Sequence, residues 1–318
     1  MFNKKICIMF SLLFVLTFIT ACGNGNEEGT SDSTNKEEGA NKERTLEHAS
    51  GEVTIPANPE RIIAPYLEDS LVALGVTPAA QWSIGSDVLD YLQPQLEGVP
   101  KIAWDMPLEQ VLKHKPDLLI FSSPSSLQNG SYEDYSKIAP TYVYKEEVSS
   151  NWRDQLKRMG RILGKQDKAE QILADFDKKV KEAKTSLQEA IGDESVAFIW
   201  TKGDQFFVFE NNRYIAEVVY SEMGVTQPEF IKNLPEAGAQ WKPMSIEKLG
   251  QLKADHVFLI GSEGEGGFET LKNSSVWQSI PAAEKDQIYV MNKPSHWTID
   301  GVIAHSMSID KIVETLAE

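Results

Sequence analysis

One stretch of the sequence, residues 165–191, constrains the fold more than any other. Its apolar side chains recur at steps of three and four residues, with Lys, Glu, Asp and Gln between them; they are Ala169, Ile172, Phe176, Val180, Ala183, Leu187 and Ala190. This spacing predicts one long amphipathic helix. At about 1.5 Å per residue the helix is roughly 40 Å long, which suits a connection between two domains. A helix packed along a single domain is the plainer alternative.

The sequences on the two sides of this helix are organised alike. On both sides short apolar strand-like segments alternate with helical segments, which indicates mainly parallel sheets covered by helices. Residues 106–121 also align with residues 244–260, with one insertion. Chance similarity between two αβ units is the alternative interpretation. We expect an α/β fold with two Rossmann-like lobes, at 44–164 and 192–318, joined by the single long α-helix 165–191, with a ligand cleft between the lobes.

The N-terminus has the pattern of a lipoprotein signal. Lys4 and Lys5 precede an apolar stretch of about 14 residues, which is short for a membrane-spanning helix. Small residues then lead to Cys22, as at the site where bacterial lipoproteins are cut and lipidated; an ordinary signal peptide is the alternative. We expect residues 1–21 to be the signal peptide and the polar residues 22–43 to be a disordered tether. Lipid on Cys22 would then anchor the protein to the outer face of the cell membrane.

The charge of the chain excludes one class of partner. The formal net charge is −16, and loss of residues 1–21 removes Lys4 and Lys5 and leaves −18. So acidic a chain is unsuited to binding nucleic acid, or to binding anionic lipid by charge alone. The other of its two cysteines, Cys7, lies in the predicted signal peptide, so no internal disulfide is expected in the mature protein.

Motifs for catalysis and for bare metal ions are weak in this sequence. The glycine-rich loop 261–267 carries Glu263 and Glu265, which would repel a phosphate, and lacks the Lys-Ser/Thr ending of a phosphate-binding loop. The sequence has no nucleophile elbow. Its five histidines are scattered, at His48, His114, His256, His296 and His305. A bare-metal binder and, more remotely, an extracytoplasmic α/β enzyme therefore stay as alternatives.

Aromatic residues stand at or near the ends of several predicted strands. They are Tyr66, Trp82, Trp104, Trp200, Trp241 and the pair His296-Trp297. Because the carboxyl ends of parallel strands face the expected cleft, these side chains predict a wide aromatic pocket, although packing in the core is the alternative for each. Arg213 begins a predicted helix, where the helix dipole gives no reason for a cation. It is either a solvated surface residue or a donor to ligand oxygens.

The folded part of the chain resembles the siderophore-binding lipoproteins of Gram-positive iron-uptake ABC transporters. The matching stretches are Arg61-Ile-Ile, Leu74-Gly-Val76, Leu108-Glu-Gln-Val, Lys115-Pro-Asp-Leu-Leu-Ile120, Ile138-Ala-Pro-Thr141, Asn212-Arg213 with Val219-Tyr and Met223-Gly, Ser275-Val-Trp277, and His296-Trp-Thr with Gly301. The chain departs from many relatives at Pro78-Ala-Ala80 and at Asp300-Gly301-Val302, where those relatives have a Gly-Pro after the tryptophan. These departures put only local loop shape in doubt.

The resemblance implies a binding protein and not an enzyme. In this family the iron arrives inside its chelator, so the protein supplies no metal ligand and no cofactor. The resemblance places ligand contacts first on Trp200, Arg213 and Trp297, then on Tyr66, Trp82, Trp104, Trp241 and His296. It also implies a monomer that docks on an ABC transporter permease dimer through one acid per lobe, here Glu109 and Glu247. The alternative for both acids is that they complement the dipoles of their helices.

The charge of the expected pocket bears on the class of siderophore. A ferric tris-catecholate carries about three negative charges and requires several cations in a pocket of low dielectric constant. Arg213 has only Lys202, Lys242 and Lys293 as helpers. We therefore expect a hydroxamate or mixed citrate–hydroxamate siderophore, with ferric catecholate, ferric citrate, haem and cobalamin as alternatives. Because residues 165–191 contain no Gly or Pro, we also expect the lobes to close by small angles.

Overall fold

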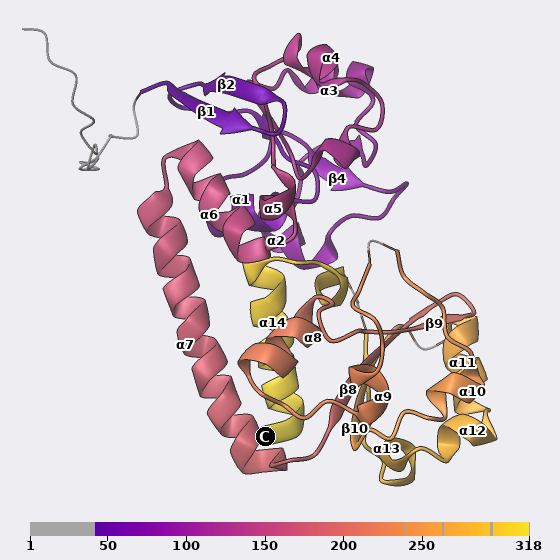
Figure 1. Ribbon diagram of the computed structural model, residues 1–318. Helices are drawn as coiled ribbons and strands as arrows, with labels where there is room; N and C mark the ends of the chain where they lie inside the picture. The colour runs from indigo at the N-terminus through magenta and orange to yellow at the C-terminus, as the bar shows by residue number, and fades with distance from the viewer. Residues whose placement is uncertain (1–41, 239, 263, 293–294, 318) are drawn as a thin grey trace, which may run out of the picture. The chain divides into compact units, whose positions relative to one another are not determined.

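The computed structural model describes residues 42–317 apart from 239, 263, 293 and 294 (Figure 1). The predicted signal peptide, Cys22, Lys293 and nearly all of the predicted tether therefore lie outside the described residues. Contacts gather residues Gly39–Glu318 into one compact unit. In the part of the chain that is described, none of the helices combines the length and the apolar character that crossing a bilayer requires.

The predicted long helix is confirmed as α7 (Gln166–Ile191), which ends at Gly192. Its buried stripe is close to the predicted one: Ala169, Leu173, Phe176, Val180, Ala183, Leu187 and Ile191. Two positions differ, because Leu173 and Ile191 face the core where the sequence pattern favoured Ile172 and Ala190. We call the described residues before α7 the N-terminal lobe and those after it the C-terminal lobe.

The strands of the N-terminal lobe form three small sheets. The first is the expected edge hairpin, in which β1 (Arg44–His48) pairs antiparallel with β2 (Gly51–Ile55). The second is parallel, in the order β3 (Ile62–Ile63), β6 (Leu118–Phe121) and β7 (Thr141–Val143). The third pairs β4 (Gln81–Ser83) with β5 (Lys101–Ala103), again parallel. All residues of β3, β6 and β7 are buried, as expected for strands covered on both faces.

The helical elements of the N-terminal lobe are mostly short. They are α1 (Glu68–Ala73), η1 (Asp90–Leu92), α2 (Gln93–Leu96), α3 (Leu108–His114), η2 (Pro124–Ser126), α4 (Tyr132–Ser136), α5 (Glu146–Ser149) and α6 (Trp152–Leu163). The side chain of Asn151 caps α6 by accepting hydrogen bonds from two backbone N–H groups. Gly164 ends α6 in the left-handed conformation and leads into α7.

The C-terminal lobe is built on one four-stranded sheet with the order β11-β10-β8-β9. The strands β8 (Val196–Lys202), β10 (His256–Ile260) and β11 (Ile288–Met291) are parallel, whereas β9 (Gln205–Val208) returns antiparallel beside β8. The helical elements are α8 (Ile215–Glu217), η3 (Val218–Glu222), α9 (Glu229–Lys232), α10 (Ile246–Leu249), α11 (Gly266–Lys272), α12 (Ser275–Gln278), α13 (Pro281–Glu284), η4 (Ser295–Thr298) and α14 (Val302–Ala317).

The aligned segments on the two sides of α7 have equivalent structures. In the first, α3 leads into β6, and in the second, α10 leads into β10, so each is a helix followed by a central parallel strand. The second of these helices, α10, is short and ends at Leu249. The helix predicted to begin at Arg213 is irregular, because α8 passes after one turn into the π-helical segment η3. Both lobes are α/β, which confirms the predicted fold class.

The last helix, α14, touches both lobes. It packs along α7, as Figure 1 shows, and its first turn meets α1 of the N-terminal lobe. Ala304 of α14 belongs to an apolar cluster whose other buried members, Trp82, Leu89, Tyr91, Leu92 and Leu96, come from the N-terminal lobe. The lobes are therefore linked covalently by α7 and by packing through the start of α14.

Candidate functional site

In the N-terminal lobe, Tyr66 and Trp82 form one aromatic pair. Tyr66 follows β3 and Trp82 lies in β4, and their ring centroids are 4.5 Å apart. Tyr66 is 43% exposed, whereas Trp82 is buried. The backbone of Tyr66 has a φ of 64°, a left-handed conformation that costs a non-glycine residue energy and that is common at ligand sites. This strained turn holds the ring of Tyr66 at the surface, on top of Trp82.

A buried carboxyl group lies beside this pair. Glu68 accepts a hydrogen bond from the backbone N–H of Trp82 at 2.8 Å. Burial raises the pKa of Glu68 to about 7, because water no longer solvates the charged form. Burial, helped by the charges of Tyr214 and Glu68, also raises the pKa of Tyr66 to about 12, so its phenol stays a hydrogen-bond donor at neutral pH.

Trp104, on the loop after β5, is the most exposed of the predicted contacts. It is 46% exposed, and its backbone N–H donates to the carbonyl of Ser83, the last residue of β4, at 2.9 Å. Since Trp82 is the preceding residue on β4, the loop that carries Trp104 is tied to the strand that carries the aromatic pair. Trp104 is therefore available to a ligand, as the sequence pattern predicts.

In the C-terminal lobe, Trp200 and Trp241 form a second aromatic group. Their ring centroids are 5.1 Å apart, and both rings also pack on Phe207, at 5.4 and 5.6 Å. Trp200 lies on β8, Phe207 on β9, and Trp241 on the segment before α10, so the antiparallel turn of β9 brings them together. The ammonium of Lys202 lies 5.3 Å from the centroid of Trp200. This group has both aromatic faces and a nearby cation.

Arg213 lies behind this group and is only 5% exposed. It is paired with Glu210: its Nε donates to Oε2, and Nη2 donates to Oε1 at 3.2 Å. Nη2 also donates to the carbonyl of Gly238 at 3.1 Å, and the guanidinium carbon lies 4.1 Å from the centroid of Trp241. Arg213 is therefore not a solvated surface residue, and its charge is not free for a ligand. Arg213 instead supports the ring of Trp241 from behind, with its charge balanced by Glu210.

Tyr214 belongs to the aromatic group of the C-terminal lobe, and the sequence pattern did not single it out as a contact. Its ring packs on Trp241 at 5.9 Å and on Phe209 at 6.2 Å, and its charge contributes to the raised pKa of Tyr66 across the lobes. Like Tyr66, it has a positive φ, 49°, just before a helix. Its position after a strand, mirroring that of Tyr66, is the sequence signal that could have identified it.

His296 and Trp297, on η4, occupy a different environment. Trp297 is 1% exposed and packs on Phe198 and Phe258 of the central strands, so most of its ring lies in the core. The ring of His296 lies 6.4 Å from that of Tyr91 in the N-terminal lobe. Burial lowers the pKa of His296 to about 4, so its imidazole is neutral at physiological pH.

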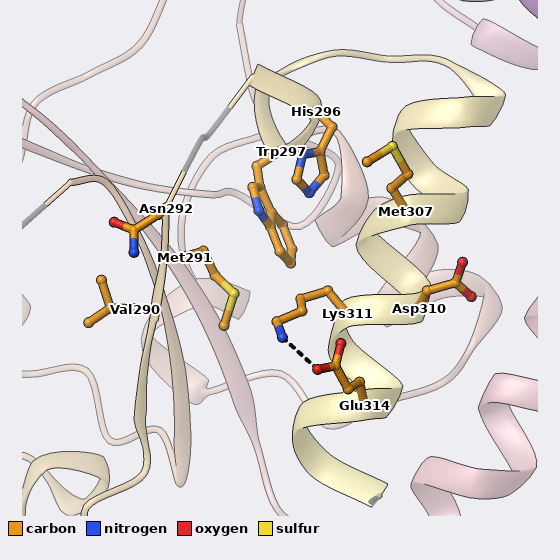
Figure 2. A pocket seen from close by; sticks show the side chains of 9 residues that line it. All are labelled: Val290, Met291, Asn292, His296, Trp297, Met307, Asp310, Lys311 and Glu314. Carbon is orange, nitrogen blue, oxygen red and sulfur yellow. Dashed lines mark hydrogen bonds and ion pairs between the residues drawn. The ribbon is translucent and has the colours of Figure 1, made fainter. Parts of the chain in front are cut away.

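A cavity of about 540 Å³ lies between β11, η4 and α14. Figure 2 shows its lining: Val290, Met291, Asn292, His296, Trp297, Met307, Asp310, Lys311 and Glu314. On its α14 side the ammonium of Lys311 pairs with Glu314 at 2.9 Å. His296 and Trp297 are the two predicted residues that line it, so the cavity is distinct from the aromatic groups of Tyr66 and Trp241.

The two predicted docking acids occupy equivalent positions. Glu109 is the second residue of α3 and Glu247 is the second residue of α10, and both are exposed. The pKa of Glu247 is lowered by hydrogen bonds from the Ser245 side chain and its own backbone. Both carboxylates are therefore at helix N-termini, where the dipole favours them, and both are accessible to a partner.

Two of the described histidines, His256 and His48, contact neighbouring side chains. His256 is buried and contacts Glu194 at 2.8 Å and Tyr289 at 3.1 Å, so it is a core residue. His48 contacts the hydroxyl of Tyr132 at 3.2 Å. Among the described residues, no three His, Cys, Asp or Glu side chains are grouped so that they could hold a metal ion.

Comparison with known proteins gives a consistent result. A family model described as periplasmic binding protein matches residues 67–294. Over 99% of its length the chain is 27% identical to the iron(3+)-hydroxamate-binding protein YxeB of Bacillus subtilis, covering 97% of that protein. It is 28% identical to the iron(3+)-hydroxamate-binding protein FhuD of the same organism, with 99% and 98% coverage.

The fold agrees with a solved structure as well. A FhuD-fold periplasmic binding protein component of a ferrichrome ABC transporter from Bacillus subtilis superposes with a TM-score of 0.70 and 25% identity. The match covers 86% of this chain and 100% of that one. With a family model that spans most of the chain and relatives that span nearly all of it, the protein belongs to the periplasmic binding protein family.

Proposed function

We propose that this protein is an extracellular receptor that captures a ferric siderophore and delivers it to an ABC importer. Membership of the family makes it a substrate-binding protein and not an enzyme. The observation that carries the proposal is the pair of aromatic groups, Trp82 with Tyr66 in one lobe and Tyr214, Trp241 and Trp200 in the other. Such rings offer broad faces to the organic shell of a chelate and need no direct bond to iron.

The charges around these rings favour a hydroxamate or mixed citrate–hydroxamate complex. The charge of Arg213 is already balanced by Glu210, and the N-terminal lobe adds the buried carboxyl of Glu68. Lys202 and Lys242 are exposed, so water screens them. Burying a tris-catecholate with about three negative charges would cost more solvation free energy than its attraction to these groups would recover. The names of the two Bacillus relatives, both iron-hydroxamate binders, point the same way.

The proposed roles of the site residues follow their exposure. Tyr66, Trp104, Trp200, Trp241 and Tyr214 offer ring faces to the chelate. Trp82 and Arg213 lie behind Tyr66 and Trp241 and fix their orientation. His296 is a neutral hydrogen-bonding group at the junction of the lobes, and Trp297 supports it from the core. Iron enters as part of the ligand, held by its chelator, and no cofactor is required.

The experiment that tests the ligand is a titration of tryptophan fluorescence with ferric and iron-free chelators. Ferric trihydroxamates should quench with a dissociation constant at or below about 1 μM, a common range for specific binding. The iron-free forms should bind more weakly, because they lack the compact chelate shape. The proposal would be contradicted if no ferric hydroxamate complex quenched the fluorescence while haem, cobalamin, ferric citrate or zinc did.

We also propose that Glu109 and Glu247 dock on the two subunits of a permease dimer. Their exposure and their equivalent positions, one per lobe, support this role. Glu109→Lys and Glu247→Lys should leave ligand affinity unchanged while cellular uptake of the labelled ferric complex falls at least about tenfold, as expected when a desolvated charge pair is reversed. Glu170→Lys, an exposed reversal on α7, is the matched control. A loss of affinity in either variant would contradict the docking role.

The proposed anchor and domain limits lie partly outside the described residues. We propose a signal peptide at 1–21, a lipid on Cys22 that holds the protein on the outer face of the cell membrane, and a tether through residue 43. The lobes at 44–164 and 192–318, joined by 165–191, would then act as a monomer. Radioactive fatty acid incorporated by the full chain, but not by a Cys22→Ser variant, tests the anchor.

A further inference from the structure

The N-terminus of α14 is capped by a side chain from the other lobe. The first N–H groups of any helix lack partners within the helix, and a side chain before the helix usually accepts their hydrogen bonds. The residue before α14 is Gly301, which has no side chain to offer. Instead, Asp69 of α1 accepts from the N–H of Ile303 at 3.1 Å and from the N–H of Ala304 at 3.0 Å.

Gly301 is required for this contact. A β-carbon at position 301 would lie 2.2 Å from the carboxyl carbon of Asp69, and within 2.6 Å of both carboxyl oxygens. Such distances are far below van der Waals contact, so any other residue would push Asp69 away from the helix. The Asp300-Gly301-Val302 sequence, where the chain departs from many relatives, thus keeps the one residue that the cap requires.

The surroundings of Asp69 hold it firmly in place. It is 2% exposed, and the hydroxyl of Tyr91 donates to its Oδ2 at 2.9 Å. Tyr91 and Ala304 also belong to the apolar cluster that the start of α14 shares with the N-terminal lobe. In a dry environment these charge-assisted hydrogen bonds are stronger than in water. The contact therefore combines a polar cap with apolar packing.

The far part of α14 is bound to α7 and to the C-terminal lobe. Lys179 of α7 pairs with Asp310 of α14, and Ile309 and Ile312 lie in the main core. The segment η4, which carries His296, comes just before Gly301. A change at the cap would thus move α14 and η4 relative to α1, and with them one lobe relative to the other.

We propose that Asp69 is a positioning residue that fixes the start of α14 on the N-terminal lobe and so sets the spacing between the lobes at which the ligand is bound. The effect on spacing is independent of the ligand, whereas the effect on affinity rests on the proposed function. Asp69→Asn and Gly301→Ala break the same contact from opposite sides, the first by weakening the acceptor and the second by steric exclusion.

The spacing is measured between spin labels on cysteines introduced at the exposed positions Glu133 and Lys272, in the full chain with Cys7 and Cys22 replaced by serine. Both Asp69→Asn and Gly301→Ala should shift or broaden the distribution of label distances. Amide exchange at Ile303 and Ala304 should speed up about fivefold, the factor that matches a typical cap. The affinity for the ferric trihydroxamate of desferrioxamine B should fall by about the same factor.

Asn151→Ala is the control for a loss of stability alone. Asn151 caps α6 through the N–H groups of Arg153 and Asp154, at 2.9 and 3.1 Å, within the N-terminal lobe. This variant should unfold about as easily as Asp69→Asn but keep the wild-type label distances and affinity. The proposal is overturned if Asp69→Asn and Gly301→Ala keep the wild-type distances, or if Asn151→Ala changes them equally. If the wild type binds no ferric chelate, the proposed function fails, and the distances and amide exchange still decide the role of Asp69.

Discussion

Each lobe buries carboxyl groups near the aromatic site, but the two lobes hold them differently. In the C-terminal lobe Glu210 is neutralised by Arg213, three residues further along the chain. In the N-terminal lobe Glu68 and Asp69 accept hydrogen bonds from backbone N–H groups, and Asp69 also accepts one from the hydroxyl of Tyr91. A neighbouring cation stabilises the charged form of a buried carboxyl group. Hydrogen bonds from backbone N–H groups offset less of the free-energy cost of burying that charge. The pH response of the buried carboxyl groups should therefore come from the N-terminal lobe.

The largest effect is expected from breaking the pair in the C-terminal lobe. Arg213→Ala leaves the buried carboxylate of Glu210 without its cation, and the free energy of unfolding in urea should fall by about 3–5 kcal/mol. Adding Glu210→Gln should recover much of this loss, since the unpaired charge is then gone. A loss below about 1 kcal/mol would show that the buried carboxyl group of the C-terminal lobe does not depend on its cation, and the contrast between the lobes would fail.

The next effect, in the N-terminal lobe, depends on pH. The pKa of Glu68 is about 7 when folded and near 4.5 when unfolded, so between these values the folded state binds more protons and stability falls as pH rises. Over that window the loss is about 3 kcal/mol. Glu68→Gln should remove this contribution, so the difference in free energy of unfolding between wild type and variant should change by about 3 kcal/mol between pH 4.5 and 8, as measured by urea unfolding. A difference that does not change with pH would assign the titration to another group.

A smaller effect is expected at the two strained tyrosines, one per lobe. Tyr66→Phe and Tyr214→Phe each remove one hydroxyl, and a neutral hydrogen bond contributes about 1 kcal/mol, so each should weaken the ferric complex roughly fivefold. Because both phenols would contact the same bound chelate, the double variant should deviate from the sum of the single effects. Strict additivity, measured by fluorescence titration, would mean that the lobes meet the ligand independently.

The smallest effect on stability is expected at Trp104. Since the ring is half exposed, Trp104→Ala should change the free energy of unfolding by less than about 0.5 kcal/mol. Ligand affinity should nevertheless fall, because an exposed ring that costs nothing to remove from the fold is free to serve binding. Trp297→Ala is the contrasting case, with a loss of about 3–5 kcal/mol from the core. If Trp104→Ala and Trp297→Ala lowered the free energy of unfolding equally, Trp104 would not differ from Trp297 in its role in the fold.

Features that depend on local sequence could be predicted well. The limits of α7, the equivalent α3–β6 and α10–β10 units and the exposure of Trp104 follow from periodicity and from the ends of strands. The burial of Trp297 could not, because the strands that cover it come from residues far away in the sequence. An arginine at a helix start likewise gives no sign that its charge is balanced by Glu210.

The case of Asp69 shows the limit most clearly. In the sequence it is an acid in the first turn of a short helix, a position that the dipole of that helix explains fully. Its partners, the N–H groups of Ile303 and Ala304, are 234 and 235 residues away. Only Gly301 offered a trace of this contact, because a glycine before a helix without a capping side chain leaves room for a cap from elsewhere.

The double attachment of the lobes, through α7 and through the start of α14, has a mechanical consequence. A body that pivots on one point can rotate about three axes, but a body held at two points can rotate only about the line through them. Opening and closing of the lobes would then be a rotation about a single axis. Side chains far from the line would travel furthest.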